Sequence, residues 1–356
     1  MSNIIKYDGL LAFHPGSYIE NVVEDLNITQ REFAERLDIN PKVLSELING
    51  DTPLKADVAL KLEKVTGMGY QMWMNLQNAY EKKKLEIEKA MQDDEIKVLN
   101  LINFRYFKEN NFIEDKRYNT KEKVETLRNL FNISNLCYLK EFNPAVSYRN
   151  ISDFDESTIV NSNIMLEIAT NIARNKADKG LDKKKLKSIL PSIRDMLCTR
   201  DDSFYSRLET VLLECGVVLV GLPNLTNSGL QGATKRFKNG SVLLLITDRN
   251  KSADIFWFSL MHEIAHILNS DFYTDKEDED KYLYNETKAD QWAENFLIPK
   301  NDYDEFIKKS NFDLEAINSF ACEMGLLTCI VIGRLKKDGY VKHNQFNEFK
   351  IRYYFN

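Results

Sequence analysis

The sequence predicts a multidomain protein that is mostly α-helical and has an α+β domain toward its C-terminal end. Three observations predict this fold class: short helical patterns with tight turns up to about residue 80, a Lys- and Glu-rich helical spacing after it, and β-like runs only beyond Cys198. At 356 residues and 43% hydrophobic content, the chain is long enough to bury more than one core. We expect a helix-turn-helix bundle, a helical connecting region, an α+β domain and a tail at residues 1–80, 81–198, 199–340 and 341–356.

Composition excludes several classes of protein. No apolar run approaches the roughly 18 residues that a membrane helix needs, and the N-terminus lacks the basic and apolar regions of a signal peptide. We therefore expect a cytoplasmic protein with no membrane partner. The five cysteines include no Cys-x-x-Cys pair, which argues against a disulfide framework or a thiolate zinc site. Histidine is scarce, so its positions are informative: His14, His262, His266 and His343.

Residues 29–50 have the pattern of two short helices joined by a tight turn. Thr29 is the expected N-cap of the first helix, with Glu32 three residues later. Pro41 follows the turn and suits the first position of the second helix. Two helices joined in this way form a helix-turn-helix. Two further helices are expected to close the bundle, over residues 55–66 and 71–80.

Several motifs in residues 14–80 occur together: the opening HPG, TQxxFAxxL, SELING, ADVALKL and WMNLQ. On these motifs the segment resembles the HigA-type antitoxin branch of the xenobiotic-response-element (XRE) helix-turn-helix family. The resemblance implies binding to operator DNA, with five side chains facing the major groove or the adjacent phosphates: Gln30, Asn40, Lys42, Ser45 and Asn49. Because the segment is acidic and Lys42 is almost the only cation near these side chains, we expect a homodimer with weak non-specific affinity.

The middle of the chain is helical in pattern and rich in charge. Residues 81–131 begin EKKKLEIEKAMQDDEIKVLN, which we interpret as a solvated connecting region rather than a partner-binding surface. A second basic helix is expected from Asp182, as its N-cap, to about Cys198. Neither segment predicts a chemical activity.

Strand patterns begin after this region. The run GVVLVGL at 216–222 predicts a strand, and GATKRF at 232–237 with SVLLLIT at 241–247 predicts a hairpin across a Lys-Asn-Gly turn. A helix is expected over about 253–268, and a compact helical unit over 314–336. The pattern is that of an α+β domain with a small sheet.

The expected helix at 253–268 contains an HExxH motif, His262-Glu263-Ile264-Ala265-His266. Its neighbours are almost all apolar, so the helix should be buried. Burying two imidazoles and a carboxylate without partners would cost on the order of several kcal/mol. The i,i+4 spacing points both imidazoles the same way and lets them share a cation, which is a better explanation than two satisfied core histidines. We predict a zinc site with His262 and His266 as ligands and Glu263 as the catalytic general base.

A third protein ligand distinguishes the classes of HExxH site. A metzincin would have Gly and His where this chain has Asn269 and Phe272, so that class is excluded. A second helix places Glu286 and Asp290 on one face, a Glu-x-x-x-Asp spacing. In this arrangement the glutamate completes a two-His, one-Glu zinc site, and the aspartate holds a ligand histidine by its other ring nitrogen. Rival third ligands are Asp290 itself, Glu294 and an acid of the run at 275–280.

Further motifs extend the pattern over residues 185–337. They include KSILPSIRDML, the segment from GATKRF to MHEIAHIL, ETKADQWAENFLIP and FACEMGLLTCIVIGRL. On these motifs the C-terminal half resembles the ImmA/IrrE metallopeptidases. The resemblance implies a gluzincin-like zinc endopeptidase domain that acts on DNA-bound repressors or related regulators, with four functional residues: His262, Glu263, His266 and Glu286.

Together these patterns predict a DNA-binding regulator whose zinc endopeptidase, latent in isolation, hydrolyses a peptide bond in a repressor or a toxin–antitoxin-type regulatory protein. The strand at 241–247 is expected to align an extended peptide along its edge. An oxyanion donor is left unassigned among Tyr282, Tyr284 and His343. One alternative is a HigA-like antitoxin and autorepressor that neutralises a toxin, with the zinc domain as sensor or scaffold. Another is a ligand sensor that controls DNA binding.

Overall fold

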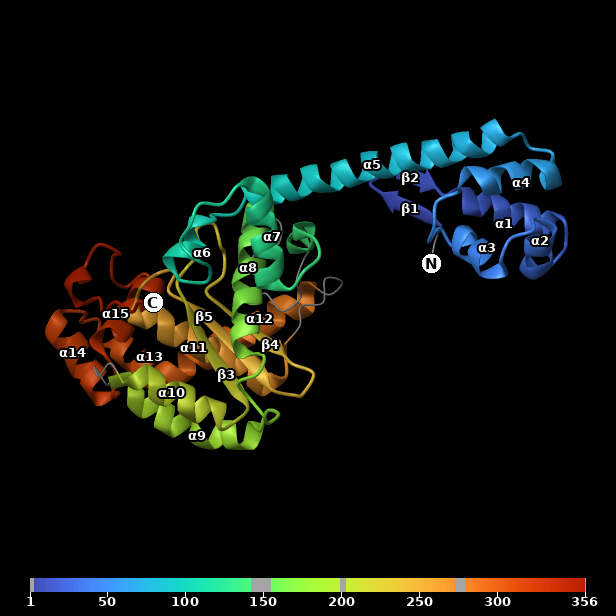
Figure 1. Cartoon of the computed structure of the whole chain (residues 1–356). Coiled ribbons are helices and arrows are strands. Elements are labelled where there is room, and N and C mark those ends of the chain that lie inside the picture. The colour runs from blue at the N-terminus through green and yellow to red at the C-terminus, as the bar shows by residue number, and fades with distance from the viewer. Residues whose placement is uncertain (1–2, 142–154, 199–202, 273–278, 356) are drawn as a thin grey trace. The chain divides into compact units, whose positions relative to one another are not determined.

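The computed structural model describes residues 3–141, 155–198, 203–272 and 279–355 of the chain (Figure 1). The chain divides into two compact units, Met1–Lys97 and Val98–Asn356, and each has its own hydrophobic core. The predicted boundaries at residues 80 and 198 do not coincide with this division. Residue 80 lies inside one long helix, and residue 198 lies inside the second unit.

The N-terminal unit begins with a short antiparallel hairpin, which the sequence did not predict. Strand β1 (Ile4–Tyr7) is joined to β2 (Leu10–Phe13) through Asp8 and Gly9, which both have positive φ. Five helices follow: α1 (Pro15–Asp25), α2 (Gln30–Arg36), α3 (Pro41–Ile48), α4 (Ala56–Thr66) and α5 (Tyr70–Asn100). Helices α2 and α3 confirm the predicted helix-turn-helix.

Side-chain caps fix where α2 and α3 begin. The Thr29 hydroxyl accepts a hydrogen bond from the Glu32 N–H at 3.1 Å. The Asn40 side chain accepts one from the Lys42 N–H at 2.8 Å, and Pro41 occupies the first turn of α3. The buried faces of both helices meet side chains from α1, α4 and α5 in one core.

Helix α5 extends far beyond the predicted range of 71–80. Its 31 residues contain no proline or glycine, and its Lys- and Glu-rich part favours helix by propensity and by pairs such as Lys83–Glu86, at 2.7 Å. The Tyr7 hydroxyl donates to Asp94 at 2.8 Å, which holds the hairpin against this helix. The predicted end at residue 80 is therefore wrong, and the charged stretch continues the same helix.

The C-terminal unit contains a three-stranded sheet of β3 (Val217–Leu222), β4 (Gly232–Arg236) and β5 (Val242–Thr247). The strand order is β3-β5-β4, with β3 parallel and β4 antiparallel to β5. The β4–β5 pair confirms the predicted hairpin. Because β5 is paired on both sides, the expectation that its edge aligns a peptide is wrong.

Helices cover both faces of this sheet. The core on one face contains residues of α6 (Arg105–Glu109), α7 (Thr120–Phe131), η1 (Leu136–Lys140) and α8 (Glu156–Ala173). The core on the other face contains or is packed against by residues of α9 (Lys183–Asp195), η3 (Met196–Cys198), α10 (Phe204–Leu213), α11 (Ala253–Asn269), α12 (Glu279–Leu297), α13 (Lys300–Lys308), α14 (Leu314–Glu323), α15 (Thr328–Lys337) and η4 (Asn347–Phe349). Figure 1 shows α8 on one face and α11 on the other, and alternate residues of the strands enter the two corresponding cores.

The C-terminal segment also belongs to this unit, although the sequence predicted a separate tail. Ile351, Tyr353 and Phe355 pack against the core that contains α11. None of the five cysteines forms a disulfide in the structure; Cys215 and Cys329 are buried, and Cys198 and Cys322 are exposed. Among the described helices, no single one is long and apolar enough to cross a membrane; only α14 and α15 taken together, bent by 114°, meet that test.

Candidate metal centre

Helix α11 confirms the helix predicted around the HExxH motif and places its two histidines on one face. His262 and His266 are buried, and the same is true of Glu286 on α12, which packs along α11. The two Nε2 atoms are 3.0 Å apart. The Glu286 carboxylate lies 3.4 Å from the His262 Nε2 and 3.3 Å from the His266 Nε2. Two helices therefore bring three ligand atoms to one point.

A carboxylate holds each imidazole by its other nitrogen. The Nδ1 of His262 lies 2.8 Å from Asp290 on α12, and the Nδ1 of His266 lies 3.2 Å from Asp271. Asp271 follows Ser270, whose left-handed conformation ends α11 and turns the chain back toward His266. A neutral imidazole that donates from Nδ1 presents a lone pair at Nε2, the form that binds metal.

These separations fit a tetrahedral metal ion. Zinc–nitrogen and zinc–oxygen bonds of about 2.0–2.1 Å place neighbouring ligand atoms roughly 3.3 Å apart. The three observed separations run from 3.0 to 3.4 Å. Two lone pairs facing each other at such a distance repel unless a cation lies between them. The donor set is therefore suited to a metal ion.

The charges around the histidines favour a bound cation. Burial lowers the pKa of His266, but the carboxylates of Asp271 and Glu286 outweigh it and raise that pKa to about 10. Burial likewise opposes protonation of His262, and Asp290 and Glu286 outweigh it, so the pKa is raised. Burial raises the pKa of Glu286, but the two histidines hold it well below its usual range. The site attracts positive charge whether a proton or a metal ion supplies it.

Glu263, the residue after His262, is also buried, and its negative charge favours the protonated form of both His262 and His266 and so acts to raise their pKa. Its carboxylate packs against the backbone of Gly232, the first residue of β4: a Cβ atom at Gly232 would lie 2.7 Å from the Glu263 Oε1. Glycine at this position therefore makes room for the carboxylate. The sequence did not predict this contact, because nothing in the local pattern links the two residues.

Two family models match the chain, each over one of its parts. The helix-turn-helix model matches residues 19–71, and the model of the IrrE N-terminal-like domain matches residues 227–327. The chain belongs to the XRE helix-turn-helix family and carries an IrrE N-terminal-like peptidase domain. That peptidase family contains metallopeptidases, and the buried His-His-Glu group lies within the matched range.

Curated relatives match about a fifth of the chain. The uncharacterized HTH-type transcriptional regulator YddM of Escherichia coli is 42% identical over 66 residues, which cover 18% of this chain and 70% of that protein. Virulence-associated protein I of Dichelobacter nodosus is 30% identical over 79 residues, covering 22% and 73%. A solved structure of a putative antidote protein of a plasmid maintenance system from Nostoc punctiforme is 34% identical, covers 22% of this chain and 94% of that chain, and has a TM-score of 0.20.

Within the peptidase domain, the rival third ligands have other partners. Asp290 contacts the Nδ1 of His262, and Glu294 pairs with Arg334 at 2.9 Å and Lys337 at 2.6 Å. Most of the acidic run at 275–280 lies outside the described residues. Of the three candidate oxyanion donors, Tyr282 is buried and two are exposed: Tyr284, with Lys288 over its ring, and His343.

In the helix-turn-helix domain, the five predicted DNA-contacting residues lie on or beside α2 and α3. Four are exposed and Ser45 is half-buried; the exposed ones are Gln30, Asn40, Lys42 and Asn49. The side-chain oxygen of Asn40 already accepts the capping hydrogen bond from the Lys42 N–H. The Lys42 ammonium lies 3.7 Å from Glu46. Lys42 remains 82% exposed and is therefore accessible to a phosphate.

Proposed function

We propose that this protein is a DNA-binding regulator whose C-terminal domain is a zinc-dependent endopeptidase. Its substrate is a repressor or a toxin–antitoxin-type regulatory protein. The observation that carries the proposal is the convergence of three buried ligand atoms at 3.0–3.4 Å, with both imidazoles held by carboxylates and Glu263 beside them. A purely structural histidine pair would not need this arrangement.

Each residue of the centre has a separate role. His262, His266 and Glu286 would hold Zn²⁺, which when bound acts as a Lewis acid and makes a water molecule acidic enough to attack near neutral pH. Glu263 takes the proton of the attacking water and passes it to the leaving amine. Asp290 and Asp271 fix the orientation of the two imidazoles.

The sheet offers a guide for the substrate on the side of β4. This strand is hydrogen-bonded to β5 on one side and ends the sheet on the other, and its first residue touches Glu263. An extended peptide added along this edge would pass the candidate centre. Cleavage is therefore expected in an unfolded or hinge segment of the substrate.

The N-terminal domain would direct this activity to DNA. We infer that it binds operator DNA as a homodimer through Gln30, Asn40, Lys42, Ser45 and Asn49, as in the HigA-type branch. Few exposed cations lie near α3, so we expect contacts to base edges, rather than to phosphates, to distinguish the operator from other DNA sequences.

The test is cleavage of regulatory proteins encoded beside this gene. Each is incubated with the zinc-loaded chain, with and without operator DNA, and products are identified by mass spectrometry. One new N-terminus is expected, absent with Glu263→Gln although this variant retains zinc. A chain that is fully loaded with zinc and cleaves none of these proteins would contradict the peptidase role and favour an antitoxin with a zinc scaffold.

A further inference from the structure

Two segments of the C-terminal unit carry a strong excess of positive charge. Residues 174–187 follow α8 and continue into α9, and residues 235–238 span the end of β4 and the start of the turn before β5. Together they contain ten Lys and Arg residues and two carboxylates, whereas the whole chain has 48 Lys and Arg residues and 54 Asp and Glu residues. Two of the ten have acidic partners: Lys185 pairs with Glu214 at 2.9 Å, and Lys235 lies 3.7 Å from Glu167.

Hydrogen bonds hold these two segments side by side. The Leu181 N–H donates to the Gly240 carbonyl at 2.9 Å, and the Asn239 side-chain amide donates to the Ala177 carbonyl at 3.1 Å. The loop that follows α8 therefore lies against the turn between β4 and β5, and the cations of one segment are neighbours of those of the other.

The remaining eight cations form one surface, which we call the basic surface: Arg174, Lys176, Lys179, Lys183, Lys184, Lys187, Arg236 and Lys238. Seven of these side chains are exposed, and Lys183 is half-buried. Lys183, Lys184 and Arg236 line one open pocket of about 520 Å³, together with Ser270 at the end of α11. The Lys183 ammonium donates to the Leu268 carbonyl at 2.8 Å, which fixes its position at this pocket.

The cations of the basic surface repel one another. Burial lowers the pKa of Lys183, and the positive charges of Lys187 and Arg236 lower it further. In the part of the chain that the structure describes, Lys184, Lys187 and Lys238 take part in no ion pair. A single anion would relieve this repulsion at one point, whereas a polymer with evenly spaced negative charges would relieve it along the whole surface.

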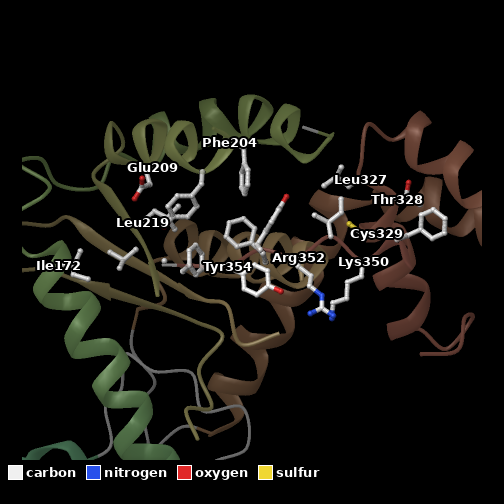
Figure 2. Close-up of a pocket in the computed structure, with 18 of the residues that line it drawn as sticks. Ile172, Phe204, Glu209, Leu219, Leu327, Thr328, Cys329, Lys350, Arg352 and Tyr354 are labelled. Carbon is white, nitrogen blue, oxygen red and sulfur yellow. The ribbon is translucent and has the colours of Figure 1, made fainter. Parts of the chain in front are cut away.

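The excess of positive charge does not extend into the adjoining cavity of about 860 Å³ (Figure 2). Lys176 also lines this cavity, but the other charged groups there carry both signs: Glu209, Glu348, Lys350 and Arg352. Aromatic side chains such as Phe204 and Tyr354 form much of the remaining wall. The basic surface is therefore a feature of the outside of this unit, and it suits an extended polyanion rather than an enclosed small molecule.

The helix-turn-helix domain has little positive charge of its own. Residues 1–80 contain seven Lys and Arg residues and eleven carboxylates. Four of the seven cations lie in ion pairs with carboxylates of the same domain: Arg31, Arg36, Lys42 and Lys61. Affinity for DNA depends strongly on how many phosphates a protein neutralises. A second set of phosphate contacts elsewhere in the chain would therefore strengthen binding considerably.

We propose that the basic surface binds the phosphate backbone of duplex DNA. Exposed lysine and arginine side chains on two adjacent segments suit a row of phosphates, and such contacts carry no sequence information. Duplex DNA is favoured over an acidic protein segment because the same chain has a helix-turn-helix domain. DNA held by that domain is at a high effective concentration for a second site on the chain. The proposal does not depend on whether the metal centre hydrolyses peptides.

The test is the fluorescence anisotropy of a labelled duplex of random sequence, titrated with the full chain at several KCl concentrations. One variant combines Lys184→Gln, Lys187→Gln and Lys238→Gln, all at exposed side chains. Each phosphate contact contributes about 0.9 to the slope of the logarithm of the binding constant against the logarithm of salt concentration. The magnitude of this slope should therefore fall by about 2.7 in the variant, and affinity at about 100 mM salt should fall at least tenfold.

Two control variants separate this contact from other effects. The first has arginine instead of glutamine at the same three positions, keeps the charge, and should bind within about twofold of the wild type. The second removes three exposed lysines outside the basic surface, on or next to α13: Lys300→Gln, Lys308→Gln and Lys309→Gln. It changes the net charge by the same amount and should leave the slope unchanged.

Four results would overturn the proposal. The first is no binding of the random duplex by the wild type. The second is an equal loss in the two glutamine variants, which would show an effect of net charge alone. The third is an arginine variant that binds as weakly as the glutamine variant at the same positions. The fourth is tighter binding of polyglutamate than of the duplex, lost in the first glutamine variant, which would indicate an acidic protein segment as the partner.

Discussion

Removing either carboxylate behind the histidines should weaken zinc binding without removing a ligand. The Asp290→Ala change leaves the His262 Nδ1 without its partner at 2.8 Å, and Asp271→Ala does the same for the His266 Nδ1 at 3.2 Å. Without these contacts the imidazoles are free to rotate or to change tautomer, and their Nε2 atoms become less basic. Such outer partners typically contribute about 10- to 100-fold to metal affinity.

The two distances allow the effects to be ranked. A contact of 2.8 Å lies within the range of about 2.7–2.9 Å for strong charge-assisted hydrogen bonds, whereas 3.2 Å lies beyond it. We therefore expect about 100-fold weaker zinc binding for Asp290→Ala, roughly 2.7 kcal/mol, and about 10-fold for Asp271→Ala, roughly 1.4 kcal/mol.

The assay is competition for zinc against a chelating indicator of known affinity. Glu294→Ala is the matched control, because Glu294 is a carboxylate on the same helix as Asp290 but pairs with Arg334 and Lys337. It should lower stability and leave zinc affinity unchanged. Equal zinc affinity in the wild type and the Asp290→Ala variant, or a larger loss in Glu294→Ala, would refute the assigned geometry.

Three further predictions concern other parts of the chain. Gly232→Ala should displace the Glu263 carboxylate and abolish hydrolysis of a cognate substrate while zinc content stays at the wild-type level; full activity would show that this contact is not needed. Burial lowers the pKa of His14, so the stability it contributes is present above pH 6.5 and is lost as pH falls through the lowered value. In urea unfolding between pH 7.5 and 5, His14→Asn should reduce this loss, because the asparagine oxygen can replace the His14 Nδ1 as acceptor for the Gly16 N–H and does not titrate. An unchanged pH dependence of the free energy of unfolding would contradict this prediction. If the Lys42 side chain contacts a phosphate, Lys42→Ala should weaken operator binding and reduce, by about 1, the magnitude of the slope of the logarithm of the binding constant against the logarithm of salt concentration. An unaltered slope would exclude that contact.

Local chemistry determined the parts that the sequence predicted well. Thr29 and Asn40 cap their helices because their side-chain oxygens are within reach of the next turn, so the helix-turn-helix followed from nearby residues. The HExxH spacing fixes two histidines on one helical face before any tertiary contact forms. The convergence of His262, His266 and Glu286 could therefore be predicted from two helical patterns.

Long-range contacts account for what the sequence did not predict. Asp271 reaches His266 only because Ser270 adopts a left-handed conformation and reverses the chain. Gly232 of β4 meets Glu263 of helix α11, a contact between residues far apart in sequence. The central position of β5 depends on its pairing with β3, which no local pattern encodes. The hairpin β1–β2 has strands of only four residues each, too short for a reliable periodicity.

The most direct test of the central claim is the metal content of protein purified without added metal, measured by mass spectrometry for the wild type and for His262→Ala. A buried His-His-Glu centre predicts close to one zinc ion per wild-type chain and a large loss in the variant. No metal in either protein, or equal metal in both, would contradict the assignment of these residues as zinc ligands.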